Sequence, residues 1–230
     1  MTTKCHECAE EFEYFEPDPN MGLNKYLFIP RYCESCFDKQ TEKVRQDIII
    51  ANKEKLENDF WNEVPKELFH DTSIGRLNAI IVSTINSWKH GPKGLGMMGK
   101  SGEGKTRAAV LILKDNHYLG RSICYMKAVK LTQYARDQFS DDSEIRNTAR
   151  ERIKKTYKCN LLLLDDIGKG RLTASAEELL FDIIDERSEK GLPVIWTSNA
   201  SGKELHAMFS LDKADAILRR LSEFSTVVKV

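Results

Sequence analysis

The sequence predicts an α/β protein built on a five-stranded parallel sheet, with a small module in front of it. From residue 75 onward, short apolar runs alternate with helical patterns, which is typical of a parallel sheet covered by helices on both faces. Residues 161–164 are four consecutive leucines, as expected of a strand buried on both faces. Two Cys-x-x-Cys pairs lie before residue 37 and set that segment apart.

Length and composition limit the class of protein. The chain has 230 residues, enough for one domain of ordinary size and a small appendage. Lys plus Arg and Asp plus Glu both number 35, so overall charge favours neither nucleic acid nor membrane. The N-terminus lacks the apolar stretch of a secretory signal, and no apolar run approaches the roughly 18 residues of a membrane span. We therefore expect a cytoplasmic protein without membrane contact.

Residues 1–37 are interpreted as a zinc-binding module. Cys5, Cys8, Cys33 and Cys36 form two pairs separated by 24 residues, and four thiolates in two such turns suit tetrahedral Zn²⁺. His6 lies inside the first pair, where its reach to a shared metal is poor. A segment with so few aliphatic residues needs a metal to fold, so the zinc is expected to be structural. Redox-active thiols are the alternative.

Residues 38–74 are interpreted as a helical connector. Val44, Ile48, Leu56 and Phe60 have the spacing of an amphipathic helix over 38–62, and Pro65 ends or restarts it. An extra helix packed on the main domain fits the pattern equally well.

The main domain is assigned to residues 75–230. Strands are predicted at residues 95–98, 122–126, 161–164, 193–197 and 226–230. Helices are predicted near 105–118, 128–139, 142–158, 174–190 and 202–221. Cys124 and Cys159 lie in apolar contexts, and we expect both to be small buried residues.

A phosphate-binding loop follows the first of these strands. Residues 99–106 fit the pattern G-x-x-x-x-G-K-[ST] completely and lead into a helix pattern. Glycines permit a tight loop whose N–H groups face phosphate oxygens, and the helix N-terminus adds partial positive charge. The residues predicted to bind ATP are Gly99, Lys100, Ser101, Gly102, Glu103, Gly104, Lys105 and Thr106. Lys105 is expected to reach the β and γ phosphates, and Thr106 to bind Mg²⁺ through its hydroxyl.

Two further polar segments end the third and fourth predicted strands. Asp165 follows the leucine run and is expected to hold Mg²⁺ through water. Asp166 is the candidate to polarise the attacking water. Asn199 ends the fourth strand and is a candidate to orient that water or contact the γ-phosphate. A turn formed by Asp165 and Asp166, or by Asn199 after its strand, is the plain structural alternative.

Four short motifs together resemble a known family. Asp165-Asp166-Ile167-Gly168-Lys169, Ile184-Asp185-Glu186-Arg187, Thr197-Ser198-Asn199 and Ile217-Leu218-Arg219-Arg220-Leu221 occur in order. Their spacing is similar to that of DnaC/DnaI-like replicative-helicase loaders of bacteria or phages, and IstB-type transposition ATPases share this core. The resemblance covers residues 64–230. It implies an AAA+ core with the P-loop strand central in the sheet, Asp165 as metal aspartate, Asn199 as sensor and Arg220 as the arginine that reaches a neighbour's ATP.

The resemblance also implies partners. They are a replicative DNA helicase, contacted through the zinc module or its neighbour, single-stranded DNA, and further copies of the chain when ATP is bound. Two departures from the family pattern matter. Asp166 stands where many AAA+ ATPases have Glu, so slow hydrolysis is expected. The sequence ends at Val230, so no helical lid with a second sensor arginine is expected.

Basic residues before the Asp165 strand are candidates for DNA contact. They are Arg150, Arg152, Lys154, Lys155 and Lys158, and Lys127, Lys130, Arg136, Tyr134 and Phe139 lie nearby. Charge combined with aromatic rings can bind single strands. Acidic residues nearby reduce the net positive charge of this region. The alternative is therefore a solvent-exposed face that does not contact DNA.

The leading functional hypothesis is an ATP-switched helicase loader with slow ATP hydrolysis. The alternatives are an IstB-like transposition helper, a zinc adaptor that binds ATP with little hydrolysis, and a small-molecule P-loop kinase. The kinase alternative lacks an arginine cluster placed for a lid. For Arg220, the alternative to a role in a neighbour's site is a surface ion pair with Asp212 or Asp215.

Overall fold

The computed structural model describes residues 2–13 and 31–230, which form two compact units, Met1–Glu57 and Asn58–Val230. The division into residues 1–37, 38–74 and 75–230 stays a prediction. None of the helices among the described residues is long and apolar enough to cross a membrane.

The first unit contains a short hairpin and most of a long helix. Strands β1 (Thr2–Lys4) and β2 (Glu11–Glu13) pair antiparallel. Helix α1 (Glu34–Glu63) spans 30 residues. It starts four residues earlier than predicted, because the Phe37 N–H donates to the Cys33 carbonyl and extends the helix through the second cysteine pair. Part of the predicted zinc module, residues 14–30, lies outside the described residues.

The second unit is organised by a parallel sheet. Its strands are β3 (Gly94–Met98), β4 (Ile123–Lys127), β5 (Leu161–Asp165), β6 (Val194–Ser198) and β7 (Ser225–Lys229). They lie in the order β4-β5-β6-β3-β7, and every pairing is parallel. This confirms the predicted five-stranded sheet. The P-loop strand β3 is an interior strand, but the middle position belongs to β6.

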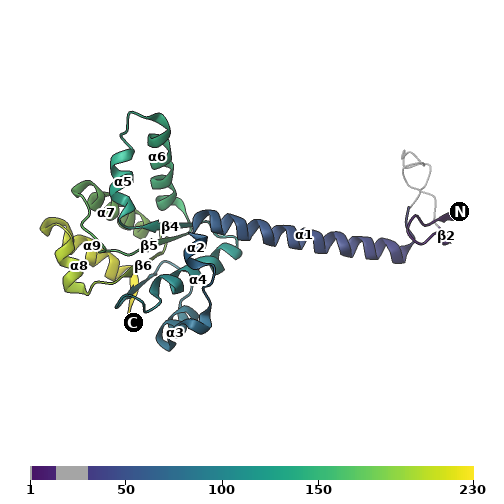
Figure 1. Ribbon diagram of the computed structural model, residues 1–230, viewed down its shortest axis with the longest axis horizontal. Coiled ribbons are helices and arrows are strands. Elements are labelled where there is room, and N and C mark those ends of the chain that lie inside the picture. Colours follow the sequence, from purple (N-terminus) through teal and green to yellow (C-terminus); the bar gives the residue numbers. More distant parts are fainter. Residues whose placement is uncertain (1, 14–30) are drawn as a thin grey trace. The chain divides into compact units, whose positions relative to one another are not determined.

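Helices cover both faces of this sheet (Figure 1). The described helices of the second unit are α2 (Lys66–Phe69), the 3-10 turn η3 (Ile74–Arg76), α3 (Ala79–Ser87), α4 (Lys105–Tyr118), α5 (Lys130–Asp137), α6 (Ser143–Lys158), α7 (Ala174–Glu189), α8 (Gly202–Met208) and α9 (Leu211–Glu223). In Figure 1, α5–α9 lie on one side of the sheet, and α3 and α4 on the other.

The leucine run explains how one strand serves two cores. Leu162 and Leu164 belong to the core under α5, α7 and α9, whereas Leu161 and Leu163 belong to the core under α3 and α4. Successive side chains of a strand point to opposite faces, so burial on both faces requires apolar residues at every position. Cys124 and Cys159 are buried as predicted.

The single helix predicted over residues 202–221 is wrong. The structure has two helices, α8 and α9, separated at Phe209 and Ser210. Phe209 is buried in the core, and the N–H of Ser210 donates to the carboxylate of Glu177, which is only 3% exposed. A buried carboxylate needs such donors, and providing them breaks the helix.

Candidate functional site

The loop of residues 99–104 joins β3 to α4 and has the backbone of a phosphate-binding turn. Gly102 and Gly104 have φ of +90° and +89°, a left-handed region that side chains with a Cβ rarely adopt. A Cβ on Gly104 would also lie 2.9 Å from Leu77 Cδ2. Helix α4 starts at Lys105, so its N-terminal N–H groups face the loop and favour an anion there.

Lys105 lies beneath this loop and is 5% exposed. Its Nζ donates to the carbonyl oxygens of Gly99 at 2.9 Å and Lys100 at 2.7 Å. Burial lowers the pKa of Lys105, and the nearby carboxylates of Asp166, Glu103 and Asp165 oppose that shift. The side chain therefore places a cation directly under the turn.

Asp165 ends β5 and is 2% exposed. One carboxylate oxygen, Oδ1, accepts from the hydroxyls of Thr106 at 2.7 Å and Thr197 at 2.8 Å. The other oxygen, Oδ2, accepts from the Tyr125 hydroxyl at 3.0 Å. Hydroxyl and carboxylate oxygens are the ligands that Mg²⁺ prefers, so the pair Thr106 and Asp165 fits the predicted metal.

Asp166 has an unusual backbone, with φ of +60°. Its N–H donates to Thr197 Oγ1 at 2.9 Å, which fixes the turn after β5. Its carboxylate accepts from Asn199 Nδ2 at 3.2 Å and pairs with Lys169 Nζ at 3.2 Å. Left-handed non-glycine residues cluster at functional sites, and here the turn directs the carboxylate toward the loop.

These residues surround one hollow of about 280 Å³ at the carboxyl ends of the strands. It is lined by Phe69, Ser101, Gly102, Gly104, Lys105, Thr106, Arg107, Asp166, Lys169 and Asn199. The predicted residues Lys105, Thr106, Asp165, Asp166 and Asn199 are thus brought together. Strand β6, which Asn199 follows, lies between the P-loop strand β3 and the Asp165 strand β5.

Four residues that line the hollow or contact Asp165 were not predicted as site residues from the sequence. They are Phe69, Arg107, Tyr125 and Lys169. Lys169 belongs to the Asp-Asp-Ile-Gly-Lys motif, so the sequence does contain a signal for it. Phe69, which lies before the domain, and Tyr125, inside an apolar strand, carry no motif. Only the folded chain brings them to the site.

Arg220 does not line the nucleotide hollow. It is near the end of α9, and it lines a crevice with Pro92 and Ser225, at the amino ends of β3 and β7. Its Nη2 is 2.7 Å from Asp185 Oδ1, whereas the sequence alternative paired it with Asp212 or Asp215. It therefore does not join the hollow of its own chain, and its role in a neighbour's site stays a prediction.

The four cysteines of the first unit meet at one point. The sulfur atoms of Cys5, Cys8, Cys33 and Cys36 all lie within 4.8 Å of one another, and Cys8 Sγ is 3.9 Å from Cys33 Sγ. A tetrahedral Zn²⁺ with Zn–S bonds of about 2.3 Å separates its sulfurs by about 3.8 Å. The Cys8 backbone N–H lowers the pKa of the Cys5 thiol to about 6, whereas hydrogen bonding to Cys33 raises that of Cys36 to about 12. Geometry and donor set fit zinc.

Changing Cys33 to Ser is expected to release zinc and unfold the described part of the first unit, because three thiolates bind the ion less tightly and the small core cannot fold alone. Wild-type protein purified without chelator should contain about one zinc per chain by elemental analysis. ATP affinity should be unchanged, since Asn58–Val230 is a separate compact unit. Cys159→Ser is the control, because this buried cysteine is outside the cluster. A metal-free wild-type sample would contradict the assignment.

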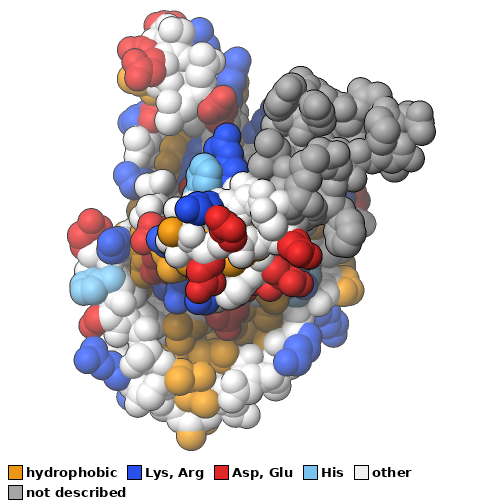
Figure 2. Space-filling model, turned by 90° about the vertical axis from the view of Figure 1, so that its right-hand side faces the viewer, with side chains coloured by type: hydrophobic (Ala, Val, Ile, Leu, Met, Phe, Trp, Pro, Cys, Tyr) orange, Lys and Arg blue, Asp and Glu red, His pale blue; other side chains and the backbone are white. Residues whose placement is uncertain are grey.

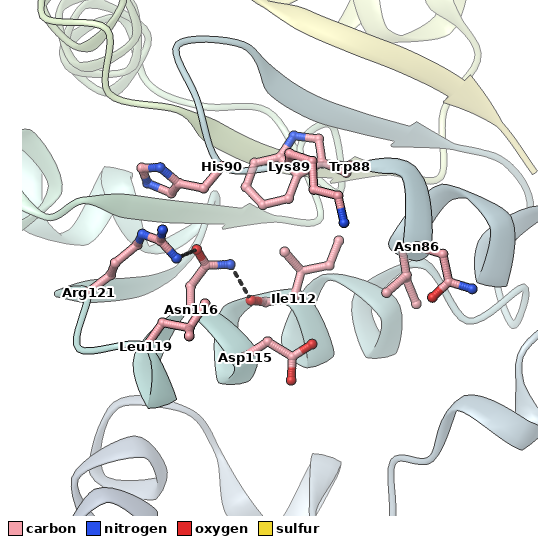
Figure 3. Close-up of a pocket in the computed structure, with 10 residues that line it drawn as sticks. Asn86, Trp88, Lys89, His90, Ile112, Asp115, Asn116, Leu119 and Arg121 are labelled. Atoms are coloured by element: carbon pink, nitrogen blue, oxygen red, sulfur yellow. Dashed lines mark hydrogen bonds between the residues drawn. The ribbon is translucent and has the colours of Figure 1, made fainter.

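A second hollow of about 440 Å³ lies at the opposite edge of the sheet (Figure 3). Trp88, Lys89 and His90 precede β3, and Arg121 precedes β4, so these side chains lie at the amino ends of the strands. Arg121 donates to the Asn116 side chain at 3.0 Å. None of the predicted site residues lines this hollow.

Comparisons with known proteins agree with this geometry. A family model described as "IstB-like ATP binding protein" matches residues 76–230. A protein of insertion sequence IS232 from Bacillus thuringiensis subsp. berliner, named for ATP binding, is 31% identical over 134 residues, which are 58% of this chain. The chain matches about half (51%) of the length of that relative.

Solved structures share the fold. The structure of DnaI has a TM-score of 0.59 at 18% identity and covers 72% of this chain and 94% of its own. The DnaC helicase loader has a TM-score of 0.54 at 21% identity and covers 75% of this chain and 98% of its own. AMPPCP-bound DnaA from Aquifex aeolicus has a TM-score of 0.55 at 18% identity, over 68% of this chain and 47% of its own.

Proposed function

The chain belongs to the IstB-like ATP-binding protein family, and from this premise we propose that it is an ATP-hydrolysing switch that binds a replicative DNA helicase and helps to place it on single-stranded DNA. One observation carries the proposal: a hollow lined by the phosphate-binding loop in one compact unit is combined with a four-cysteine cluster in another. An ATP-dependent adaptor needs both a switch and a separate surface for its partner.

The nucleotide site has the residues for slow hydrolysis. Lys105 and the loop N–H groups would bind the phosphates, and Thr106 and Asp165 would hold Mg²⁺. When bound, Mg²⁺ neutralises charge on the β and γ phosphates. Asp166 orients the attacking water, and Asn199 holds the Asp166 carboxylate at 3.2 Å. Asp is one methylene shorter than the usual Glu, and its ion pair with Lys169 restrains it further, so turnover is slow.

A transposition helper is the second candidate, because the relative from IS232 belongs to an insertion sequence. That protein and this chain are similar over 134 residues. The cysteine cluster favours the loader, because the resemblance to helicase loaders implies a helicase contact through such a module or its neighbour. The partner recovered with the protein distinguishes the two.

The structure separates the basic residues of α6 into those that have partners in the chain and those that are exposed. Arg152 and Lys155 both pair with Glu63, whose side chain is 7% exposed, and Arg150 donates to the Gln138 carbonyl. Lys154 and Lys158 are exposed, as is Phe139 at 74%. Figure 2 shows basic and acidic side chains together on the projection at the top, which α5 and α6 form in Figure 1. DNA contact is therefore assigned to Lys154 and Lys158, with Phe139 as a stacking surface.

Charge reversal of Lys154 and Lys158 together is expected to weaken single-stranded DNA binding about tenfold or more at low salt. Each phosphate contact contributes about 0.7 to the slope of log affinity against log salt, so the slope should decrease by about 1.4. Fluorescence anisotropy with a labelled oligonucleotide measures both quantities, and ATP turnover with and without the same oligonucleotide tests the switch.

The control reverses Lys93 and Lys203, two exposed lysines on other parts of the second unit. An equal loss with the control would show that only net charge matters. Unchanged affinity in the Lys154 and Lys158 variant would remove the DNA site from α6.

A further inference from the structure

We propose that Tyr125 is a positioning residue for the metal aspartate, holding the Asp165 carboxylate in the orientation that faces Thr106. The inference rests on the proposed Mg²⁺-dependent nucleotide site. It assigns a role to a strand residue that no motif includes.

The contacts of Asp165 divide between its two oxygens. Oδ1 receives both threonine hydroxyls, at 2.7 and 2.8 Å, and Oδ2 receives the Tyr125 hydroxyl at 3.0 Å. At 2% exposure, Asp165 has little access to water, and a buried carboxylate requires donors. Without the tyrosine hydroxyl, Oδ2 is left buried without this donor, and only the two threonine hydroxyls on Oδ1 hold the carboxylate against rotation about its bond to Cβ.

Tyr125 is itself held firmly. It lies in β4, the edge strand next to β5, and no further strand of the described residues pairs with its outward N–H and C=O groups. The carboxylate of Glu63 accepts from the Tyr125 N–H at 2.7 Å, and Arg152 Nη2 donates to the Tyr125 carbonyl. Arg152 also pairs with Glu63 at 2.8 Å. These side chains cover the open strand edge at the residue whose hydroxyl meets Asp165.

The ring of Tyr125 is fixed as well. It is 5% exposed, and its centroid lies 6.2 Å from that of Phe69, which lines the nucleotide hollow. The ring therefore has little freedom to carry its hydroxyl away from Asp165.

The test is Tyr125→Phe, which keeps the ring and removes only the hydroxyl. Loss of an outer-shell group that positions the surroundings of a metal typically lowers metal affinity 10- to 100-fold. We expect the Mg²⁺ concentration for half-maximal tightening of ATP binding, measured with a fluorescent ATP analogue, to rise about tenfold. Affinity in EDTA should stay within about twofold of wild type, which separates positioning from general damage.

Tyr157→Phe is the control, because Tyr157 is a partly buried tyrosine that lies on α6, away from the hollow. It should behave like wild type. An unchanged Mg²⁺ requirement in Tyr125→Phe, or an equal loss of affinity in EDTA, would overturn the positioning role. If wild-type nucleotide binding were itself independent of Mg²⁺, the role would also be wrong.

A second variant covers the case in which Tyr125→Phe does not fold. Glu63→Gln keeps the Tyr125 hydroxyl but weakens the hydrogen bond that anchors the Tyr125 backbone. It should raise the Mg²⁺ requirement by a smaller factor, about threefold. An unchanged Mg²⁺ requirement in Glu63→Gln would also count against the positioning role of Tyr125. Binding is measured without turnover, so a protein that binds Mg-ATP but never hydrolyses it would disprove the proposed ATPase and leave this inference intact.

Discussion

Replacing Lys105 with alanine is expected to abolish ATP binding at micromolar nucleotide, with a loss of affinity of about 100-fold or more. Lys105 is the buried cation under the loop, and its Nζ lies within 3 Å of two loop carbonyls. Hydrogen bonds to charged groups are worth about 1.5–3 kcal/mol each, and about 1.4 kcal/mol corresponds to tenfold in affinity. Isothermal titration calorimetry with ATP and Mg²⁺ measures the loss directly.

Asp166→Asn is the matched control for Lys105→Ala. It keeps the size of the side chain and lies in the same hollow, but it removes the charge that orients the water. We expect ATP to bind normally and turnover to fall by most of its value. Tight ATP binding by Lys105→Ala would contradict the assignment of the loop, and wild-type turnover by Asp166→Asn would assign the water to another residue.

Removing the guanidinium of Arg220 is expected to lower ATP turnover about 10³-fold or more without loss of ATP binding. Arginine fingers contribute about 10³–10⁵ in rate by stabilising charge on the transferred phosphoryl group. Arg220 lies at the amino ends of β3 and β7, whereas its own P-loop lies at the carboxyl ends. Its side chain, 28% exposed and paired with Asp185, therefore lies outside its own nucleotide hollow, and the role at a neighbouring chain's ATP is the prediction under test.

Mixing inactive variants tests this assignment. Arg220→Ala and Lys105→Ala should each be inactive alone, and together they should recover part of the turnover, because some interfaces then combine an intact loop with an intact arginine. Arg219→Ala is the control, since the adjacent residue points about 100° away on the helix. A mixture that co-assembles but stays inactive, or normal turnover by Arg220→Ala alone, would contradict a role between chains.

The sequence predicted the parts of the fold that depend on local patterns. The leucine run identified β5, and the eight-residue loop pattern identified the start of α4, because burial and backbone geometry act on consecutive residues there. The same reasoning connected Asp165, Asp166 and Asn199, since parallel strands deliver their carboxyl ends to one edge.

The remainder depends on contacts between distant residues. The predicted helix is interrupted at Ser210 because the Ser210 N–H donates to the carboxylate of Glu177, 33 positions away. Tyr125 reaches Asp165 across 40 positions, and Glu63 reaches Arg152 across 89. Neither periodicity nor a short motif predicts such contacts. The folded structure is therefore needed to tell the paired basic residues of α6 from the exposed ones, and to find the tyrosine that donates to Asp165.

Identification of the partner tests the proposed function most directly. Tagged wild-type chain and Cys33→Ser should be used to capture proteins from the native host in the presence of ATP and Mg²⁺, with Lys105→Ala as the nucleotide control. We predict that mass spectrometry finds a replicative DNA helicase with the wild type, and that Cys33→Ser loses it. Recovery of a transposase in its place, with the helicase absent, would contradict the loader function and establish the transposition alternative.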